Sequence, residues 1–263
     1  MVVEGFNCHD ELVAKTKQKL CYSDDVSYPE WKEKVKDKLF ELLGLDLIAE
    51  NACEPNFKIV EEKQKEGYKQ VRFEFESEHG SVVPCYILIP DTGKEKYPVV
   101  ITLQGHSSGF HNSIKEPLED DYIAYALTRG CFAVQAVKKG YIAVAVEQRA
   151  MGERATFNTP KRRVSVGVGT GGCYNNQMTA FMLGRTTIGE RCWDISRTID
   201  MLKYFPQCDM DKIAITGNSG GGTTSYYAAC CDERIKISAP SCAFCPYPES
   251  ILKFYQRLYH YGR

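Results

Sequence analysis

Hydrophobic residues in the first third of the chain follow two successive patterns. Between residues 31 and 43, apolar side chains recur every three or four positions, after a Ser-x-x-Glu pattern that begins at Ser27 and before Gly44. This spacing and these end signals predict an N-terminal helix. Apolar and charged residues then alternate over residues 71–75, and a second apolar stretch covers residues 82–89. The two stretches predict a pair of antiparallel strands.

From residue 97 onward, short apolar runs alternate with amphipathic segments. The runs, which predict buried strands, are residues 97–103, 141–146, 212–216 and 235–241. The segments that predict helices are residues 121–127, 131–139, 187–204, 223–231 and 248–261. This alternation is typical of an α/β protein whose central sheet is mostly parallel and flanked by helices. Residues 150–186 interrupt it with glycines and basic residues, so we expect a long excursion over the edge of the sheet.

Composition is typical of a globular protein and argues against nucleic acid and membranes as partners. It has 263 residues, of which 43% are hydrophobic, and a formal net charge of -1. We expect one domain over residues 1–263, with residues 1–70 as a helical N-terminal extension. A nearly neutral chain is not expected to bind nucleic acid, and no apolar run approaches the roughly 18 residues that span a membrane. The chain shows no secretory signal pattern and its twelve cysteines are scattered, so we expect free thiols and a cytoplasmic location.

A Gly-x-Ser-x-Gly motif, Gly217-Asn-Ser219-Gly-Gly221, directly follows the predicted strand at 212–216. In so tight a strand-to-helix turn, larger side chains two residues either side of the serine would clash with neighbouring backbone. The turn exposes the serine hydroxyl at the carboxyl edge of the sheet, and the helix behind it points amides at developing negative charge. The motif predicts Ser219 as a nucleophile and the Gly220 amide as an oxyanion donor. The alternative is a glycine-rich connection without chemistry.

A second candidate follows the predicted strand at 97–103, in the sequence Leu103-Gln-Gly-His-Ser-Ser-Gly109. A serine hydrolase of this architecture needs a second oxyanion amide from the loop after that strand. Gly105 allows the backbone to approach closely, and we expect the amide of His106 to be the donor. Two alternatives for His106 are a catalytic base and an ordinary loop residue. The base is less favoured because it comes late in the chain in this architecture.

The order of elements and four motifs resemble the α/β-hydrolase superfamily, and more narrowly its acetyl xylan esterase and dienelactone-hydrolase-like branch. The motifs are the loop at 103–109, the Gly-x-Ser-x-Gly turn, Glu147-Gln-Arg-Ala-Met-Gly-Glu153 and Cys192-Trp-Asp-Ile-Ser-Arg-Thr-Ile-Asp200. The resemblance covers residues 30–250 and implies a serine that attacks an ester carbonyl, often an acetyl group on a sugar. We therefore expect a serine hydrolase of carboxylic esters, with a small-molecule or carbohydrate ester as substrate.

By position, the resemblance implies Ser219 as the nucleophile and the amides of Gly220 and His106 as the oxyanion hole. Four further residues match a helix signature of the family, for which we predict a structural role. They are Trp193, Asp194, Arg197 and Asp200. We expect no cofactor and no metal ion, and the sequence defines no oligomeric state.

Two departures from the family pattern bear on the subgroup. Gln104 stands where members usually have a histidine before the loop glycine. The cephalosporin-C deacetylase subgroup carries Arg-Gly-Gln after the next strand and Gly-x-Ser-Gln-Gly at the nucleophile. This chain has Arg149-Ala-Met151 and Gly220 there, which disfavours that subgroup.

The acid and base of a catalytic triad are not evident after Ser219. In this fold they follow the nucleophile, as Asp or Glu and then His, after two later strands. Asp232 and Glu233 are expected to end the helix behind the serine and point away, while Glu249 comes one strand early. His260 is the candidate base, with a partly buried helix residue as the alternative. Three explanations stay open: a truncated enzyme, a catalytically inactive hydrolase fold that serves as a binding module, and completion by a partner chain.

For four other motifs, a structural role is favoured over a catalytic or binding role. Gly167-Val-Gly-Thr-Gly-Gly172 matches a dinucleotide-binding pattern but follows no buried strand. Cys242-Ala-Phe-Cys245 has thioredoxin-like spacing, yet too little chain follows it for such a domain. Cys230-Cys231 lacks the spacing of a zinc ligand pair. Residues 161–163 form a short basic cluster that we interpret as a solvated loop tip.

Overall fold

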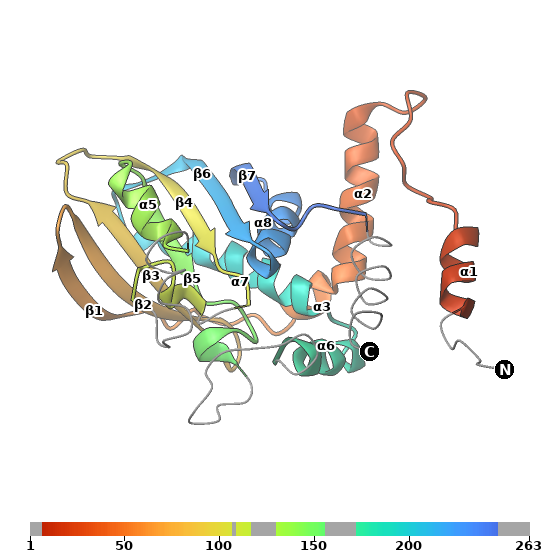
Figure 1. The fold of residues 1–263 in the computed structure, drawn as a ribbon, viewed down its shortest axis with the longest axis horizontal. Helices are drawn as coiled ribbons and strands as arrows, with labels where there is room; N and C mark the ends of the chain where they lie inside the picture. The colour runs from red at the N-terminus through yellow and green to blue at the C-terminus, as the bar shows by residue number, and fades with distance from the viewer. Residues whose placement is uncertain (1–6, 107–108, 117–129, 156–171, 247–263) are drawn as a thin grey trace, which may run out of the picture. The chain divides into compact units, whose positions relative to one another are not determined.

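The computed structural model describes residues 7–106, 109–116, 130–155 and 172–246, which form an α/β fold (Figure 1). Its α-helices are α1 (Asn7–Lys15), α2 (Tyr28–Leu43), α3 (Leu45–Ala49), α5 (Phe132–Lys138), α6 (Gly172–Met182), α7 (Thr187–Met201) and α8 (Gly220–Cys231). Its strands are β1 (Lys58–Lys65), β2 (Tyr68–Glu78), β3 (Ser81–Pro90), β4 (Tyr97–Leu103), β5 (Ile142–Val146), β6 (Cys208–Asn218) and β7 (Ile235–Ser241). Short 3-10 turns cover Gly109–His111 (η1), Gly152–Arg154 (η3) and Leu202–Tyr204 (η4). The helices predicted at 121–127 and 248–261 lie outside the described residues.

The chain divides into two compact units, residues 1–37 with 244–263, and residues 38–243. In the first unit, the Trp31 ring lies edge-on to Tyr22 with centroids 5.4 Å apart, and its Nε1 donates to the Leu20 carbonyl at 2.9 Å. The second unit contains the sheet and every residue of the candidate site that the structure describes. The single domain over 1–263 stays a prediction.

The sheet has seven strands in the order β1-β2-β3-β5-β4-β6-β7. The pairs β1–β2, β2–β3 and β3–β5 are antiparallel, whereas β5–β4, β4–β6 and β6–β7 are parallel. The antiparallel pair expected from residues 71–89 and the parallel strands expected from the apolar runs are both confirmed. Because β4, β5 and β6 are parallel neighbours, their carboxyl ends meet at one edge of the sheet, where ligands bind in open α/β sheets.

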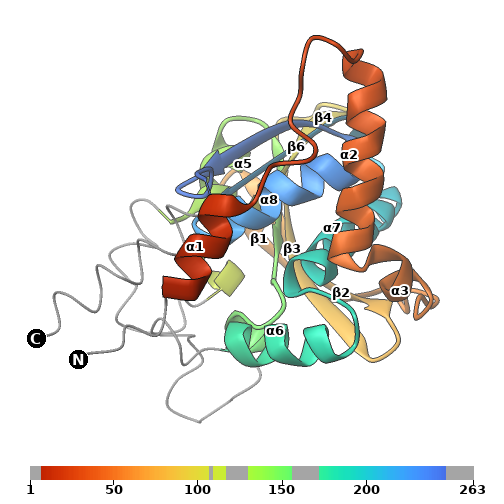
Figure 2. The ribbon, with the colours of Figure 1, turned by 90° about the vertical axis from the view of Figure 1, so that its right-hand side faces the viewer.

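Helices cover both faces of the sheet. On one face, α7 and α8 pack over a core that includes Phe73, Ile101 and Ile199 (Figures 1 and 2). On the other face, α5 covers a smaller cluster that includes Leu88 and Val134. Each of these side chains is nearly or fully buried, and such burial stabilises the fold by about 1.5–3 kcal/mol per large apolar residue.

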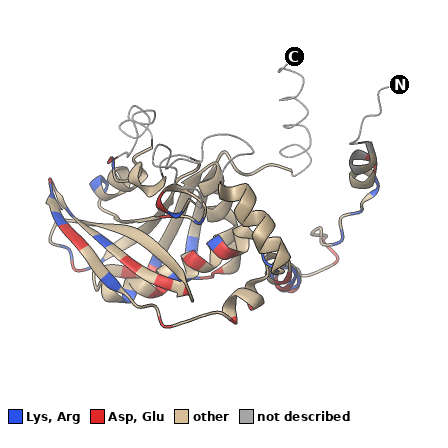
Figure 3. Cartoon of the chain, turned by 90° about the horizontal axis from the view of Figure 1, so that it is seen from below, with Lys and Arg blue, Asp and Glu red and all other residues tan. Residues whose placement is uncertain are grey.

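Three elements were not expected from the hydrophobic pattern. Strand β1 is an edge strand exposed along most of its length, and its charged residues of both signs are visible on the outer strands in Figure 3. Helix α6 lies inside the region 150–186, which has no long apolar stripe and for which the excursion over the edge of the sheet stays a prediction. Helix α3 is a single short turn after Gly44. None of the helices in the described part of the chain combines the length and apolar character of a bilayer span.

Candidate active site

Ser219 occupies a strained turn between β6 and α8. Its backbone angles are φ 53 and ψ -118, which are unusual for a residue with a side chain. The turn is fixed on both sides, because the Ser219 amide donates to the Ser241 carbonyl at 2.8 Å and its own carbonyl accepts from the Thr223 amide at 2.9 Å. Such backbone conformations cost about 1–3 kcal/mol and cluster at functional sites. The strand-turn-helix context predicted for the motif is therefore present.

The glycines around Ser219 are required by close backbone contacts. A β-carbon on Gly217 would overlap the backbone of Gly221, and one on Gly221 would overlap the carbonyl of Leu103. A β-carbon on Gly222 would lie 2.8 Å from the β-carbon of Ala243. The expectation that larger side chains clash two residues either side of the serine is confirmed.

The loop after β4 approaches the same turn. Leu103 is in register with Gly217 across the parallel pair β4–β6, so both strands end side by side. A β-carbon on Gly105 would lie 2.8 Å from the Asn218 carbonyl oxygen and 3.0 Å from the Ser219 β-carbon. Gly105 therefore lets the loop lie against the serine, as predicted.

Gln104 holds this loop from the inside. It is 2% exposed, and its side-chain amide donates to the Ser113 hydroxyl at 2.9 Å and to the Gly130 carbonyl. The main-chain carbonyl of Gln104 accepts from the side-chain amide of Gln148, which lies on the loop after β5. Gln104 thus ties the loop to three neighbouring parts of the chain, at Ser113, Gly130 and Gln148.

The imidazole of His106 lies between the Ser219 turn and a cysteine that the sequence pattern did not single out. Its Nε2 is 3.1 Å from Sγ of Cys173, in the first turn of α6, and its ring lies 3.4 Å from where a β-carbon on Gly220 would be. Nη2 of Arg191, on α7, donates to the same sulfur at 3.0 Å. Burial raises the pKa of the Cys173 thiol, but its contacts with His106 and Arg191 outweigh burial and lower the pKa to about 7.

Glu147, at the end of β5, joins two turns beneath the site. Its buried carboxylate accepts from the amide of Phe110 at 3.3 Å and from that of Glu153 at 3.1 Å. Gly109 and Gly152 both have positive φ, and a β-carbon on either would overlap this carboxylate. Burial raises the pKa of Glu147 well above its usual range. The first residue of the motif at 147–153 therefore fixes η1 and η3 against each other.

The helix signature on α7 has the structural role we predicted. Trp193 Nε1 donates to the main-chain carbonyl of Ser77 at 2.8 Å, which ties α7 to the end of β2. Arg197 Nη1 pairs with Asp200 Oδ2 at 2.8 Å, one turn along the same helix. Nη2 of Arg197 also donates to the Cys53 carbonyl at 3.3 Å, so Trp193 and Arg197 each hold neighbouring backbone against α7.

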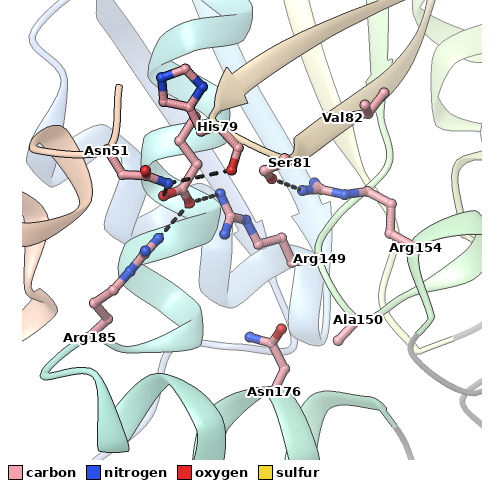
Figure 4. A pocket seen from close by; sticks show the side chains of 11 residues that line it. Asn51, His79, Ser81, Val82, Arg149, Ala150, Arg154, Asn176 and Arg185 are labelled. Atoms are coloured by element: carbon pink, nitrogen blue, oxygen red, sulfur yellow. Dashed lines mark hydrogen bonds and ion pairs between the residues drawn. The ribbon is translucent and has the colours of Figure 1, made fainter. Parts of the chain in front are cut away.

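A polar cavity of about 360 Å³ lies beside the β2–β3 turn and is lined in part by Arg149 and Arg154 (Figure 4). Both arginines pair with the buried carboxylate of Asp194, at 2.9 and 2.7 Å. Burial alone would raise the pKa of Asp194, but Arg149 and Arg154 hold it well below its usual range. Arg149 and Arg185 both reach Glu78, at 2.6 and 2.5 Å. Since the arginines of the cavity are paired with carboxylates, this network stabilises the fold, and Ser219 does not line it.

Asp232, which follows α8, has a structural role away from Ser219. Asp232 caps the end of α8 opposite to Ser219, about 18 Å away along a twelve-residue helix. Its carboxylate pairs with Arg234 at 2.6 Å and accepts from the Ser196 hydroxyl at 2.8 Å. The expectation that Asp232 points away from the serine is confirmed. The candidate base His260 and the acidic Glu249 lie outside the described residues.

The described residues contain no group of three or more His, Cys, Asp and Glu side chains arranged to hold a metal ion. All twelve cysteines are free thiols. Cys242 and Cys245 are both exposed, while Cys85, Cys131, Cys192 and Cys208 are buried, as expected for cysteines within apolar stretches. The basic cluster at 161–163 and most of the glycine-rich motif at 167–172 lie outside the described residues.

The mixed sheet, with its helices on both faces and the glycine-flanked serine after β6, defines an α/β hydrolase. Residues 3–231 match the Abhydrolase family, and the chain belongs to it. The resemblance and the fold class inferred from the sequence are thereby confirmed. Among curated proteins, none gives a significant sequence match to this chain.

Several solved structures share the fold at low sequence identity. A protein assigned as an acetyl xylan esterase from Bacteroides fragilis NCTC 9343 has a TM-score of 0.76 and 20% identity, over 90% of this chain and 60% of its own. An acetyl xylan esterase from Paenibacillus sp. R4 has a TM-score of 0.56 and 16% identity, over 93% and 67%. A glucuronoyl esterase from Solibacter usitatus has a TM-score of 0.54 and 12% identity, over 87% and 64%. The chain thus spans about 60% of the length of the Bacteroides protein.

Proposed function

We propose that the chain carries the nucleophile and oxyanion hole of a serine esterase that hydrolyses carboxylic esters. The single observation that carries the proposal is the strained conformation of Ser219, at φ 53, in a turn that three glycines make possible. A nucleophile elbow of this kind presents the hydroxyl at the carboxyl edge of the sheet. A connection without chemistry has no need to hold a serine there at a cost in stability.

The proposed oxyanion hole consists of the main-chain amides of Gly220 and His106. Gly220 is the first residue of α8, so its amide has no partner within the helix, and the helix dipole favours negative charge beside it. The position of Gly105 against Ser219 supports the second donor, because it brings the next residue of the β4 loop to the serine. Removal of one such donor typically costs a factor of 10² to 10³ in rate.

In the proposed reaction, Ser219 Oγ bonds to the ester carbonyl carbon and the alcohol leaves with a proton. Water then releases the acid from the acyl-serine. A histidine that follows Ser219 in the chain would accept the serine proton, because an uncharged serine is a weak nucleophile near neutral pH. His260 is the candidate for this role, and a base from a partner chain is the alternative.

For the substrate we propose an ester of a carbohydrate, with an acetyl group on a sugar hydroxyl as the first choice. The names of the structural relatives, acetyl xylan esterases and a glucuronoyl esterase, support this class. The twelve free cysteines support a reducing, cytoplasmic location for the protein.

Release of acetate from acetylated xylo-oligosaccharides tests the proposal, with a methyl glucuronate ester as the second substrate. We expect acetate release by the wild type and a loss of at least about 10³-fold in Ser219→Ala. Ser241→Ala is the matched control, because it removes a nearby exposed hydroxyl and keeps the main-chain carbonyl that fixes the turn. Hydrolysis of only the glucuronate ester would replace acetylated sugars by glucuronate esters as the substrate class. Equal activity in wild type and Ser219→Ala would overturn the proposal.

A further inference from the structure

Three side chains from separate elements converge on one sulfur atom next to the Ser219 turn. Cys173 comes from α6, His106 from the loop after β4 and Arg191 from α7. The guanidinium of Arg191 is held in place independently of the thiol, because its Nε and Nη2 also donate to the Arg149 carbonyl at 3.1 and 2.6 Å. The contact of Cys173 with Arg191 is therefore made by a guanidinium held in place and not by a chance approach of a flexible side chain.

The chemistry of this cluster differs from that of the other cysteines. A thiol within hydrogen-bond reach of an imidazole and a guanidinium is the arrangement that favours thiolate, the nucleophilic form of cysteine. The first turn of a helix adds to this effect through the helix dipole. By contrast, burial raises the pKa of Cys85 and Cys208, so these thiols stay protonated. Cys173 is also only partly buried, whereas Cys85 and Cys208 are buried.

We propose that Cys173, paired with His106 and Arg191, is a nucleophilic thiolate that hydroperoxides oxidise to a sulfenic acid. In this step the sulfur attacks one peroxide oxygen, an S–O bond forms and the O–O bond breaks. The sulfur loses two electrons, and the other oxygen leaves as hydroxide or alkoxide and takes a proton from water. Two equivalents of a small thiol reverse the modification: the first forms a mixed disulfide with Cys173 and releases water, and the second releases the Cys173 thiol and leaves as the disulfide of the small thiol. This site goes beyond ester hydrolysis, because the oxidation requires neither Ser219 nor an ester.

The exposed cysteines of the same chain provide an internal control. Five cysteines are more exposed than Cys173, namely Cys8, Cys21, Cys230, Cys242 and Cys245. If access alone decided reactivity, they would react first. With a pKa of about 7 for Cys173 and about 8.5 for an ordinary thiol, the thiolate fraction at pH 6 differs by about 30-fold. A more acidic thiolate is a weaker nucleophile, which lowers this ratio about 5-fold. Cys173 is therefore expected to react with peroxide about 6-fold faster than an ordinary thiol.

The experiment treats the full chain with hydrogen peroxide at pH 6 in the presence of dimedone, which traps sulfenic acids, and maps the adducts by peptide mass spectrometry. We expect Cys173 to be the first cysteine labelled, about 6-fold faster than the exposed cysteines. Labelling of the exposed cysteines before Cys173 would overturn the proposal. Fluorophosphonate labelling of Ser219 in a parallel sample tests the esterase separately, so failure of one proposal is distinguishable from failure of the other.

Two variants test the role of the nitrogen partners. In His106→Gln and in Arg191→Gln we expect labelling of Cys173 to slow, and in the double variant we expect the rate of an ordinary thiol of similar exposure, a decrease of about 6-fold. Circular dichroism identifies a variant that does not fold, and His106 is the safer change because its side chain is exposed. Unchanged labelling of Cys173 in a folded His106→Gln protein would show that the pairing has no chemical effect and would overturn the proposal.

Discussion

Arg149 and Asp194 form a bidentate ion pair in the interior, with Nε 3.0 Å from Oδ2 and Nη2 2.9 Å from Oδ1. The side chain of Asp194 is 2% exposed and that of Arg149 is 11% exposed. The pair joins the loop after β5 to α7, and the carbonyl of the same arginine accepts from Arg191. Two of the motifs that resemble the family are thus connected by this contact, which in turn supports the cluster around Cys173.

Removal of the charge on Asp194 should destabilise the protein strongly. Breaking one side of a buried ion pair typically costs about 3–5 kcal/mol, because the partner charge stays buried without compensation. We expect Asp194→Asn to lower the free energy of unfolding by this amount in urea denaturation. Asp200→Asn is the control, since Asp200 is 30% exposed and its pairs are worth about 1 kcal/mol or less each. Equal losses of unfolding free energy in the two variants would show that the buried pair stabilises the protein no more than the exposed pairs do.

Gly105→Ala should separate folding from chemistry. The new β-carbon would lie 2.8 Å from the Asn218 carbonyl and 3.0 Å from the Ser219 β-carbon, so the β4 loop must move away from the serine. We expect the rate of fluorophosphonate labelling of Ser219 to fall at least about 10-fold in a folded protein, since the loop supplies one oxyanion amide.

Gly67→Ala is the matched control for Gly105→Ala. Gly67 has φ +79 and open space around its α-carbon, so alanine costs about 1 kcal/mol of stability and touches nothing at the site. Labelling of Ser219 should stay at the wild-type rate. If Gly105→Ala also labelled at the wild-type rate, the proposed role of the β4 loop would be wrong.

Glu147 should make stability depend on pH above the acid range. Burial raises its pKa in the folded state well above the value of about 4.3 in the unfolded chain, so the folded state retains a proton that the unfolded state releases. The free energy of unfolding therefore falls as pH rises through this window, by up to about 1.4 kcal/mol per pH unit. Carboxylates with a lowered pKa, such as Glu153 at about 2, change the free energy of unfolding only at more acidic pH, below this window.

Urea denaturation between pH 5 and pH 6.5, below the range in which Cys173 titrates, checks this dependence. Glu147→Gln should remove the downward slope, because the amide does not titrate. The exposed Glu61→Gln should retain the wild-type slope. A slope in Glu147→Gln that matches the wild type would contradict the assignment of the buried proton to Glu147.

Oxidation of Cys173 should slow the chemistry of Ser219. An oxygen added to Sγ on the side of His106 Nε2 would fill the 3.1 Å contact between the two atoms, and we expect the imidazole to shift and to disturb its own main chain. Because the His106 amide is a proposed oxyanion donor, we expect peroxide to lower the labelling rate of Ser219 at least about 10-fold. Dithiothreitol should restore the rate, and Cys173→Ser should show no loss. Full labelling of the oxidised wild type would contradict this coupling.

The sequence predicted the elements whose side chains are buried on a regular face. The apolar runs of β4, β5 and β6 and the stripe of α7 each have one strong period, so both type and position could be inferred. Strand β1 could not be inferred, because an edge strand exposed on both faces carries no alternation of apolar and polar residues. Helix α6 likewise has few buried side chains in its described span, so its pattern has no apolar stripe.

At the candidate site, the sequence predicted what is local and missed what is assembled across the chain. The turn at Ser219 and the approach of Gly105 follow from glycines beside a strand, and both are present in the structure. Cys173 was missed because its partners are 67 and 18 positions away, and only the fold brings them to one sulfur atom. Tertiary packing also decides that Glu147 is a buried acid, which no local pattern indicates.

The most direct test of the central claim is intact-mass spectrometry after fluorophosphonate treatment of the wild type and of Ser219→Ala. We expect one adduct on the wild type and none on Ser219→Ala, because an activated serine reacts with this reagent and an ordinary hydroxyl does not. An activated Ser219 would mean that a base reaches it from this chain or from a partner. A wild-type protein that is folded and takes no adduct would contradict the esterase and favour a hydrolase fold that binds ligands without catalysis.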